Sequence, residues 1–109
     1  MKNEPSKPFD FEKHYELLKD SEQAAIYLEG CLADGNMELF QEALKNVAKA
    51  QGGMTYLANE TGLARQALYR SLSKKGKPQM ETITKALSAL GLRFSIVPER
   101  NAPRGVRPS

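Results

Sequence analysis

The apolar residues of this chain recur mainly at intervals of three and four positions, which predicts a series of short amphipathic helices. Phe11, Tyr15 and Leu18 begin the series and predict a short first helix. A second helix is expected over about residues 22–33 and a third over about residues 37–51. Their inner faces hold Ala24, Tyr27, Leu28, Cys31 and Leu32 in the second helix, and Met37, Phe40, Leu44, Val47 and Ala48 in the third.

Polar and glycine residues between these segments mark the helix ends. Ser21 and Asn36 carry side-chain oxygens that accept hydrogen bonds from the first N–H groups of a helix, so they are the expected N-caps. The pair Gly52-Gly53 is expected to end the third helix.

Residues 54–73, MTYLANETGLARQALYRSLS, predict two further helices, about 55–61 and 64–73, joined by a tight turn at Gly62. Gly62 permits a positive φ between the helices, and the small Ala58 lets them approach closely. The apolar residues around them, which would clamp the helices at a steep angle, are Leu57, Leu63 and Leu68. This arrangement is typical of a helix-turn-helix unit.

The last apolar repeat predicts a helix over about residues 80–90, stopped by Gly91, with Met80, Ile83, Leu87 and Leu90 on its inner face. After it, RFSIVP (93–98) alternates polar and apolar residues and predicts a short strand ended by Pro98. A lone strand has unpaired backbone on both edges, so it requires a partner. The chain itself offers only Pro8–Phe11, and the expected solution is the same strand of a second copy, in a homodimer.

The charge of the chain is unevenly distributed. Residues 1–53 hold 6 Lys and 10 Asp or Glu, whereas residues 54–78 hold five cations against Glu60 alone. Residues 79–109 add 5 basic residues against Glu81 and Glu99. The basic charge therefore begins at the predicted helix pair, and such a localised field suits contact with phosphates.

The helix predicted over 64–73 has two chemically different sides. Its inner side is small and apolar, whereas its outer side carries Arg65, Gln66, Tyr69 and Arg70. Arginine pairs with guanine and glutamine with adenine in the major groove, so this outer side has the chemistry of base readout. An ordinary solvated helix face is the alternative interpretation. Tyr69 fits a phosphate, a thymine methyl or the edge of the core, and Arg70 fits a phosphate or a base.

Other residues near this helix are candidates for backbone contacts. Lys74, Lys75 and Lys77 form a loop that either contacts phosphates or is simply a solvated loop. Thr55 either caps its own helix or helps to hold a phosphate at that helix start. Ala64 is the first residue of the helix predicted over 64–73, the end at which such a helix contacts DNA.

The sequence offers little for catalysis. His14 is the one histidine and Cys31 the one cysteine, so neither a disulfide, a Cys-rich zinc site nor a Ser-His-Asp set is expected. No Gly-rich phosphate loop is present, and we expect no cofactor, no metal and no enzyme. No apolar run approaches the roughly 20 residues that span a membrane, and the first residues lack a secretory stretch, so a cytoplasmic protein is expected.

The segments LANETGLARQALYRSL (57–72) and KPQMETITKALSALGLRFSIV (77–97) resemble the Xre/Cro class of helix-turn-helix proteins. More narrowly, they are similar to the addiction module antidote branch, close to HigA-type antitoxins. Further residues match that branch over about 9–97, among them Tyr27-Leu28, Phe40, Ala43-Leu44, Val47-Ala48 and Gly53-Met54. The chain departs from the usual Ser or Thr at Ala64 and at Gln79, and a lost N-cap costs about 1 kcal/mol.

The resemblance implies an all-α domain of five or six helices, of the lambda-repressor-like helix-turn-helix type, with a short C-terminal β-strand. Within one domain over 9–98, we expect N-terminal helices in 9–51, the helix-turn-helix in 54–73 and the last helix and strand in 79–98. Residues 1–8 are expected to be a flexible arm and 99–109 a basic, flexible tail.

The resemblance also implies the function of an antitoxin in a type II toxin–antitoxin module. Such a protein neutralises a RelE/HigB-like ribonuclease toxin and, as a dimer, binds operator DNA to repress its own operon. Two alternatives remain open: a stand-alone phage-type repressor, and a protein-interaction module that has lost DNA binding. The acidic first half is either a solvated face or a surface for a basic ribonuclease.

Overall fold

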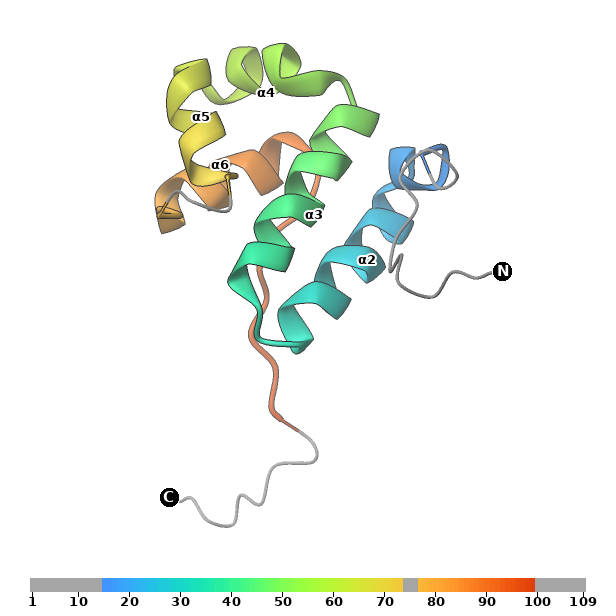
Figure 1. The fold of residues 1–109 in the computed structure, drawn as a ribbon. Coiled ribbons are helices and arrows are strands. Elements are labelled where there is room, and N and C mark those ends of the chain that lie inside the picture. Colours follow the sequence, from blue (N-terminus) through green and yellow to red (C-terminus); the bar gives the residue numbers. More distant parts are fainter. Residues whose placement is uncertain (1–14, 74–76, 100–109) are drawn as a thin grey trace, which may run out of the picture.

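Helix α3 (Met37–Ala50) lies at the centre of the domain, between α2 and η1 and the group formed by α4, α5 and α6 (Figure 1). The computed structural model describes residues 15–73 and 77–99. Within these ranges the chain forms a 3-10 turn and five α-helices, and their bounds are η1 Leu17–Lys19, α2 Ser21–Ala33, α3 Met37–Ala50, α4 Gly53–Thr61, α5 Arg65–Ser71 and α6 Met80–Ala89. The described part of the chain is thus all-helical, as expected.

Helices α2 and α3 form an antiparallel pair, connected by a short turn in which Gly35 has a φ of 72° (Figure 1). The cap of α3 is the predicted one, because the Asn36 side chain accepts a hydrogen bond from the Leu39 N–H. The predicted cap of α2 is wrong. Asp20 accepts the hydrogen bond from the Gln23 N–H, and Ser21 is the first residue of the helix.

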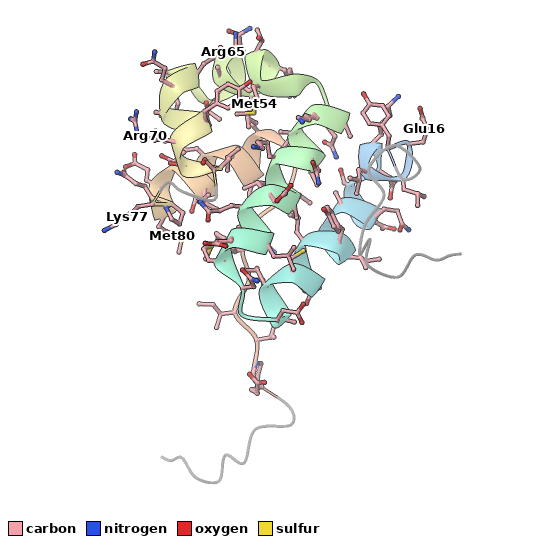
Figure 2. All side chains as sticks on the ribbon, in the orientation of Figure 1. Glu16, Met54, Arg65, Arg70, Lys77 and Met80 are labelled. Carbon is pink, nitrogen blue, oxygen red and sulfur yellow. The ribbon has the colours of Figure 1, made fainter. Side chains whose placement is uncertain are left out.

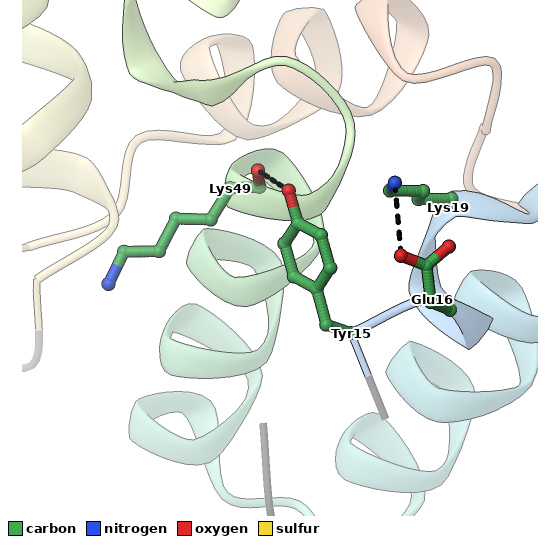
Figure 3. Close-up of polar contacts among 4 residues, drawn as sticks. All are labelled: Tyr15, Glu16, Lys19 and Lys49. Carbon is green, nitrogen blue, oxygen red and sulfur yellow. Dashed lines mark hydrogen bonds and ion pairs between the residues drawn. The ribbon is translucent and has the colours of Figure 1, made fainter. Parts of the chain in front are cut away.

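Hydrogen bonds connect the beginning of the described chain, around η1, to the end of α3. Figure 3 shows the Tyr15 hydroxyl donating to the Lys49 carbonyl at 3.5 Å. The Gln51 side chain donates to the Leu18 carbonyl at 2.9 Å. Of the predicted first helix, the described residues include only this short turn, and its Leu18 is buried as the spacing predicts. A surface ion pair between Lys19 and Glu16 lies beside it (Figure 3).

The turn between α3 and α4 depends on two consecutive glycines. Gly52 has a φ of 124° and Gly53 a φ of 88°, a region that other residues rarely adopt. Helix α4 begins at Gly53, so Thr55 lies within its first turn and is not its N-cap, contrary to prediction. A Cβ atom on Gly52 would also lie 2.8 Å from the Tyr56 ring, which leaves no space for any other residue.

The turn between α4 and α5 follows the sequence prediction closely. Gly62 ends α4 in the left-handed conformation, with a φ of 75°. The Thr61 hydroxyl donates to the Leu57 carbonyl at 2.8 Å and accepts from the Leu63 N–H at 3.2 Å, which closes the turn. Of the three residues predicted to clamp the helices, Leu57 and Leu68 are fully buried, and Leu63 is partly buried against the core.

The core is aliphatic and extends from Leu18 to Leu90. Cys31 belongs to it, as predicted, and burial raises the pKa of its thiol. The prediction that Met37 and Met80 are core residues is wrong, because their side chains are 47% and 68% exposed. Each is the first residue of its helix, where the apolar stripe projects beyond the end of the core.

The predicted strand over 93–98 is absent: residues 92–99 form no regular secondary structure, and the described ranges contain no strand. Phe94 turns back onto the core, with its ring centroid 6.2 Å from that of Phe40. Beyond it, Ile96 is 98% exposed and Val97 is 71% exposed. A strand needs hydrogen bonds from a neighbour, and no described segment of this chain supplies one.

Several expectations concern residues outside the described ranges. These are the arm over 1–8, the candidate partner strand Pro8–Phe11, His14, the loop residues 74–76 and the tail after Glu99. Among the described helices, none combines the length and apolar character that crossing a bilayer requires.

We predict that Gly52→Ala lowers the free energy of unfolding by about 1–3 kcal/mol, because the new Cβ meets the Tyr56 ring and the φ is strained. The matched control is Gly30→Ala, at an exposed site inside α2 where a Cβ meets nothing within 4 Å. That change should raise stability by about 0.5–1 kcal/mol. Urea denaturation of both variants tests the pair, and equal stabilities would contradict the strain at Gly52.

Candidate nucleic-acid interface

The outer side of α5 is open to solvent. Arg65, Gln66, Tyr69 and Arg70 are all exposed, whereas Leu68 and Ser71 on the other side of the helix are buried. The division into two sides that the sequence predicts is therefore present. Figure 2 shows Arg65 and Arg70 at the edge of the domain, with no protein segment covering them.

Arg65 and Tyr69 lie together on this surface. The guanidinium carbon of Arg65 is 5.8 Å from the centroid of the Tyr69 ring, which is the distance of a cation–π contact. Tyr69 is 43% exposed, so its phenol is available at the surface and does not close the core. The contact places a cation over the ring of an exposed phenol.

The positive charge of this surface is not neutralised within the described ranges. Arg65, Arg70 and Lys77 form no ion pair with any described residue. Lys77 is exposed just before α6 and lies at the same edge of the molecule as Arg70 (Figure 2). Lys74 and Lys75, the other candidates of this loop, lie outside the described residues.

The remaining two candidates lie at the starts of α4 and α5. Thr55 is exposed in the first turn of α4. Ala64 is the N-cap of α5, with a φ of −67° and a ψ of 142°, and its side chain provides no capping bond. Helix α5 consequently begins without the hydroxyl group that a Ser or Thr would place there.

A buried glutamine that the sequence reasoning missed holds the other end of α5. Gln41 of α3 is 1% exposed, and its Nε2 donates to the carbonyl of Ser71 at 2.7 Å and to that of Ser73 at 2.8 Å. The final carbonyl groups of a helix have no partner within the helix, so a side-chain donor at this place fixes the helix end. The spacing along α3 could have predicted its burial, since Gln41 lies three residues before Leu44 and seven before Ala48, and both of these are buried.

The described residues include no group of three or more His, Cys, Asp or Glu side chains arranged to hold a metal ion. The chemistry of the surface around α5 is therefore that of cations, amides and a phenol, which suits an anionic polymer with hydrogen-bonding edges.

Comparison with known proteins adds a family to this geometry. Residues 6–98 match the family described as probable addiction module antidote protein, and the chain belongs to that family. A protein of Haemophilus influenzae, described as uncharacterized, is 35% identical over 99 residues, which cover 91% of this chain and 98% of the relative. No solved structure matches the chain.

Membership of this family defines the class of protein. An antidote of an addiction module acts as an antitoxin and so has a toxin as its partner. Such antidotes are regulators and not enzymes, and this chain is not an enzyme.

We predict that Gln41→Met lowers the free energy of unfolding by about 1–3 kcal/mol, because it leaves the buried Ser71 carbonyl and the Ser73 carbonyl without this donor. Methionine has a similar volume, so the effect reports the hydrogen bonds and not a cavity. Gln23→Met, on the exposed side of α2, is the control and should change stability by less than about 0.5 kcal/mol. Thermal unfolding followed by circular dichroism measures both, and similar melting temperatures would refute the role of Gln41.

Proposed function

We propose that this antidote is a DNA-binding antitoxin of the helix-turn-helix type, in the Xre/Cro class and close to HigA. It neutralises a RelE/HigB-like ribonuclease toxin, and as a dimer it binds operator DNA to repress its own operon. The observation that carries the DNA-binding part is the exposed cationic side of α5, which follows a Gly62 turn and a buried apolar clamp. Family membership supports the antitoxin part.

In this proposal α5 enters the major groove. Arg65 and Gln66 lie in its first turn, where helix-turn-helix proteins contact base edges, and they supply sequence choice together with Tyr69. Ala64 presents a methyl group at the helix start, which suits a thymine methyl.

Phosphate contacts supply most of the affinity. Arg70 lies in the last turn of α5, and the loop that follows carries Lys74, Lys75 and Lys77. Thr55 in the first turn of α4 is a further candidate for a backbone phosphate. These contacts act on any sequence and weaken as salt increases.

Dimerisation would supply a second α5 helix for the operator. The segment over 93–98 forms no helix, and its Ile96 and Val97 side chains are 98% and 71% exposed, which suits a segment that pairs with a partner. We propose that it pairs with the same segment of a second copy across a two-fold axis. The two α5 helices would then enter successive major grooves about 34 Å apart.

A repressor of its own operon acts where the chromosome is, so we propose a cytoplasmic location. The rival functions are a stand-alone phage-type repressor and an interaction module without DNA binding. The uncapped start of α5 at Ala64 is the observation that favours the second rival. Titration with the chain's own promoter DNA at two salt concentrations tests the second rival, because an interaction module binds no DNA even at low salt.

We predict that Arg65→Ala relaxes base choice at one operator position and costs about 1–3 kcal/mol of binding free energy. Lys77→Ala should instead weaken all sequences about equally and reduce the salt dependence by roughly one phosphate contact. Lys19→Ala, an exposed cation on η1, is the control and should leave binding unchanged. Fluorescence anisotropy with single-base operator variants measures these effects, and an equal loss on every sequence for Arg65→Ala would contradict base readout.

We predict that Ile96→Pro converts the dimer to a monomer and weakens operator binding, because proline lacks the backbone N–H that strand pairing uses. Ile96→Thr keeps that donor and a β-branched side chain, so it should remain dimeric. Sedimentation equilibrium of both variants is the measurement. A dimer that survives Ile96→Pro would show that the interface lies elsewhere.

A further inference from the structure

Helix α2 carries apolar residues among the glutamates of the side that faces solvent, as well as on the side that faces the core. Ala24 and Leu28 are buried, yet Ile26 is 64% exposed and Leu32 is 38% exposed. Exposed apolar residues with polar residues around them mark interaction sites. In the described structure only α3 and η1 pack extensively against α2, so its outer side has no partner.

A cavity of about 200 Å³ opens beside this outer side. Ala25, Glu29 and Leu32 of α2 line one wall, and Phe40 of α3 and the segment with Arg93 and Phe94 line others. A cavity of roughly 150 Å³ accommodates a benzene ring, so this one accepts an aromatic or a large aliphatic side chain. A partner that covers α2 therefore has a place to anchor.

Helix α2, which forms part of the cavity wall, carries negative charge and no cation. From residue 20 to residue 44 the sequence holds six acidic residues and no Lys or Arg. Glu22 and Glu29 are exposed on α2 and form no ion pair with any described residue. Among the lining residues, Glu29 of α2 carries a negative charge and Arg93, after α6, carries a positive one.

We infer that the outer side of α2, together with this cavity, is the surface that holds the toxin. The toxin would insert an apolar side chain between α2 and Phe94 and would bring basic residues to Glu22 and Glu29. This inference rests on the proposed antitoxin function and specifies where that function is carried out.

A second copy of the chain fits this surface poorly. In a two-fold interface the same patch meets itself, so Glu22 and Glu29 would face their own counterparts, and like charges across an interface are costly. A head-to-tail contact of the basic α5 surface with α2 would give a ring or an open chain and would cover the surface proposed to bind DNA. A basic protein of a different kind avoids both problems.

The surface also leaves α5 free. Helix α2 lies on the far side of α3 from α4 and α5 (Figure 1). A toxin bound to α2 therefore does not cover Arg65 or Arg70, and one antidote can hold toxin and operator together.

The test uses the full chain and the tagged product of the neighbouring reading frame as the probe. The variants are the double charge reversal Glu22→Lys/Glu29→Lys and the cavity-filling Ala25→Trp, all at exposed positions. The matched control is Glu60→Lys/Glu81→Lys, which makes the same change of net charge on α4 and α6. Calorimetric titration measures affinity, and circular dichroism checks that each variant is folded.

We expect both α2 variants to bind the probe at least about tenfold more weakly, the control to bind like the wild type, and all three to keep operator binding. Wild-type affinity should fall as salt increases. Either α2 variant binding like the wild type overturns the inference and leaves the antitoxin function intact. Loss of the homodimer in Ala25→Trp assigns the cavity to a second copy and also overturns it. If the wild type itself does not bind the probe, the proposed function fails and the inference fails with it.

Discussion

The Gln41 side chain connects the central helix to the end of the helix that carries the basic surface. Helix α5 has seven residues, and a helix of that length is not stable by itself. Its position therefore depends on tertiary contacts, which are the burial of Leu68 and Leu72 and the two hydrogen bonds from Gln41. Apolar packing has little directional preference, whereas a buried amide must find acceptors at definite places. Any other orientation of α5 would leave that amide without these partners, so the bonds select the observed orientation.

Local sequence was sufficient for the helices and for the turn at Gly62, because apolar spacing and the need for a positive φ each point to one solution. Local sequence was insufficient to identify the N-cap of a helix where two neighbouring residues are both suited to that position. Asp20 and Ser21 are both good N-caps, and only the path of the chain from η1 decides between them. Likewise, helix α4 begins at Gly53 although Thr55 is the better cap, since the two glycines set the direction of the chain.

The burial of some residues was predicted wrongly, because helical spacing indicates which side of a helix faces inward but not how far the core extends along it. Met37 and Met80 occupy correct positions on their stripes and yet lie beyond the core. Gln41 is the opposite case, a polar residue on an inward-facing register that finds acceptors on a distant segment. The alternation of polar and apolar residues over 93–98 is typical of a strand. A strand forms only beside a second strand, and no described segment of the single chain provides one.

Two surfaces of opposite charge lie on different sides of one small domain. Cations lie on α5 and at Lys77 before α6, whereas α2 has carboxylates and no cation. Each surface attracts charge that the other repels, so under the proposed function the operator and a basic toxin would be directed to different places.

The exposed segment after Phe94 has a consequence for the lifetime of the protein. Residues 92–99 form neither helix nor strand, and Ile96 and Val97 are exposed, so this backbone has little protection from proteases. Pairing between two copies would bury this backbone and shield it. The lone subunit is then the form most open to cleavage, and dilution alone would hasten the removal of the antidote.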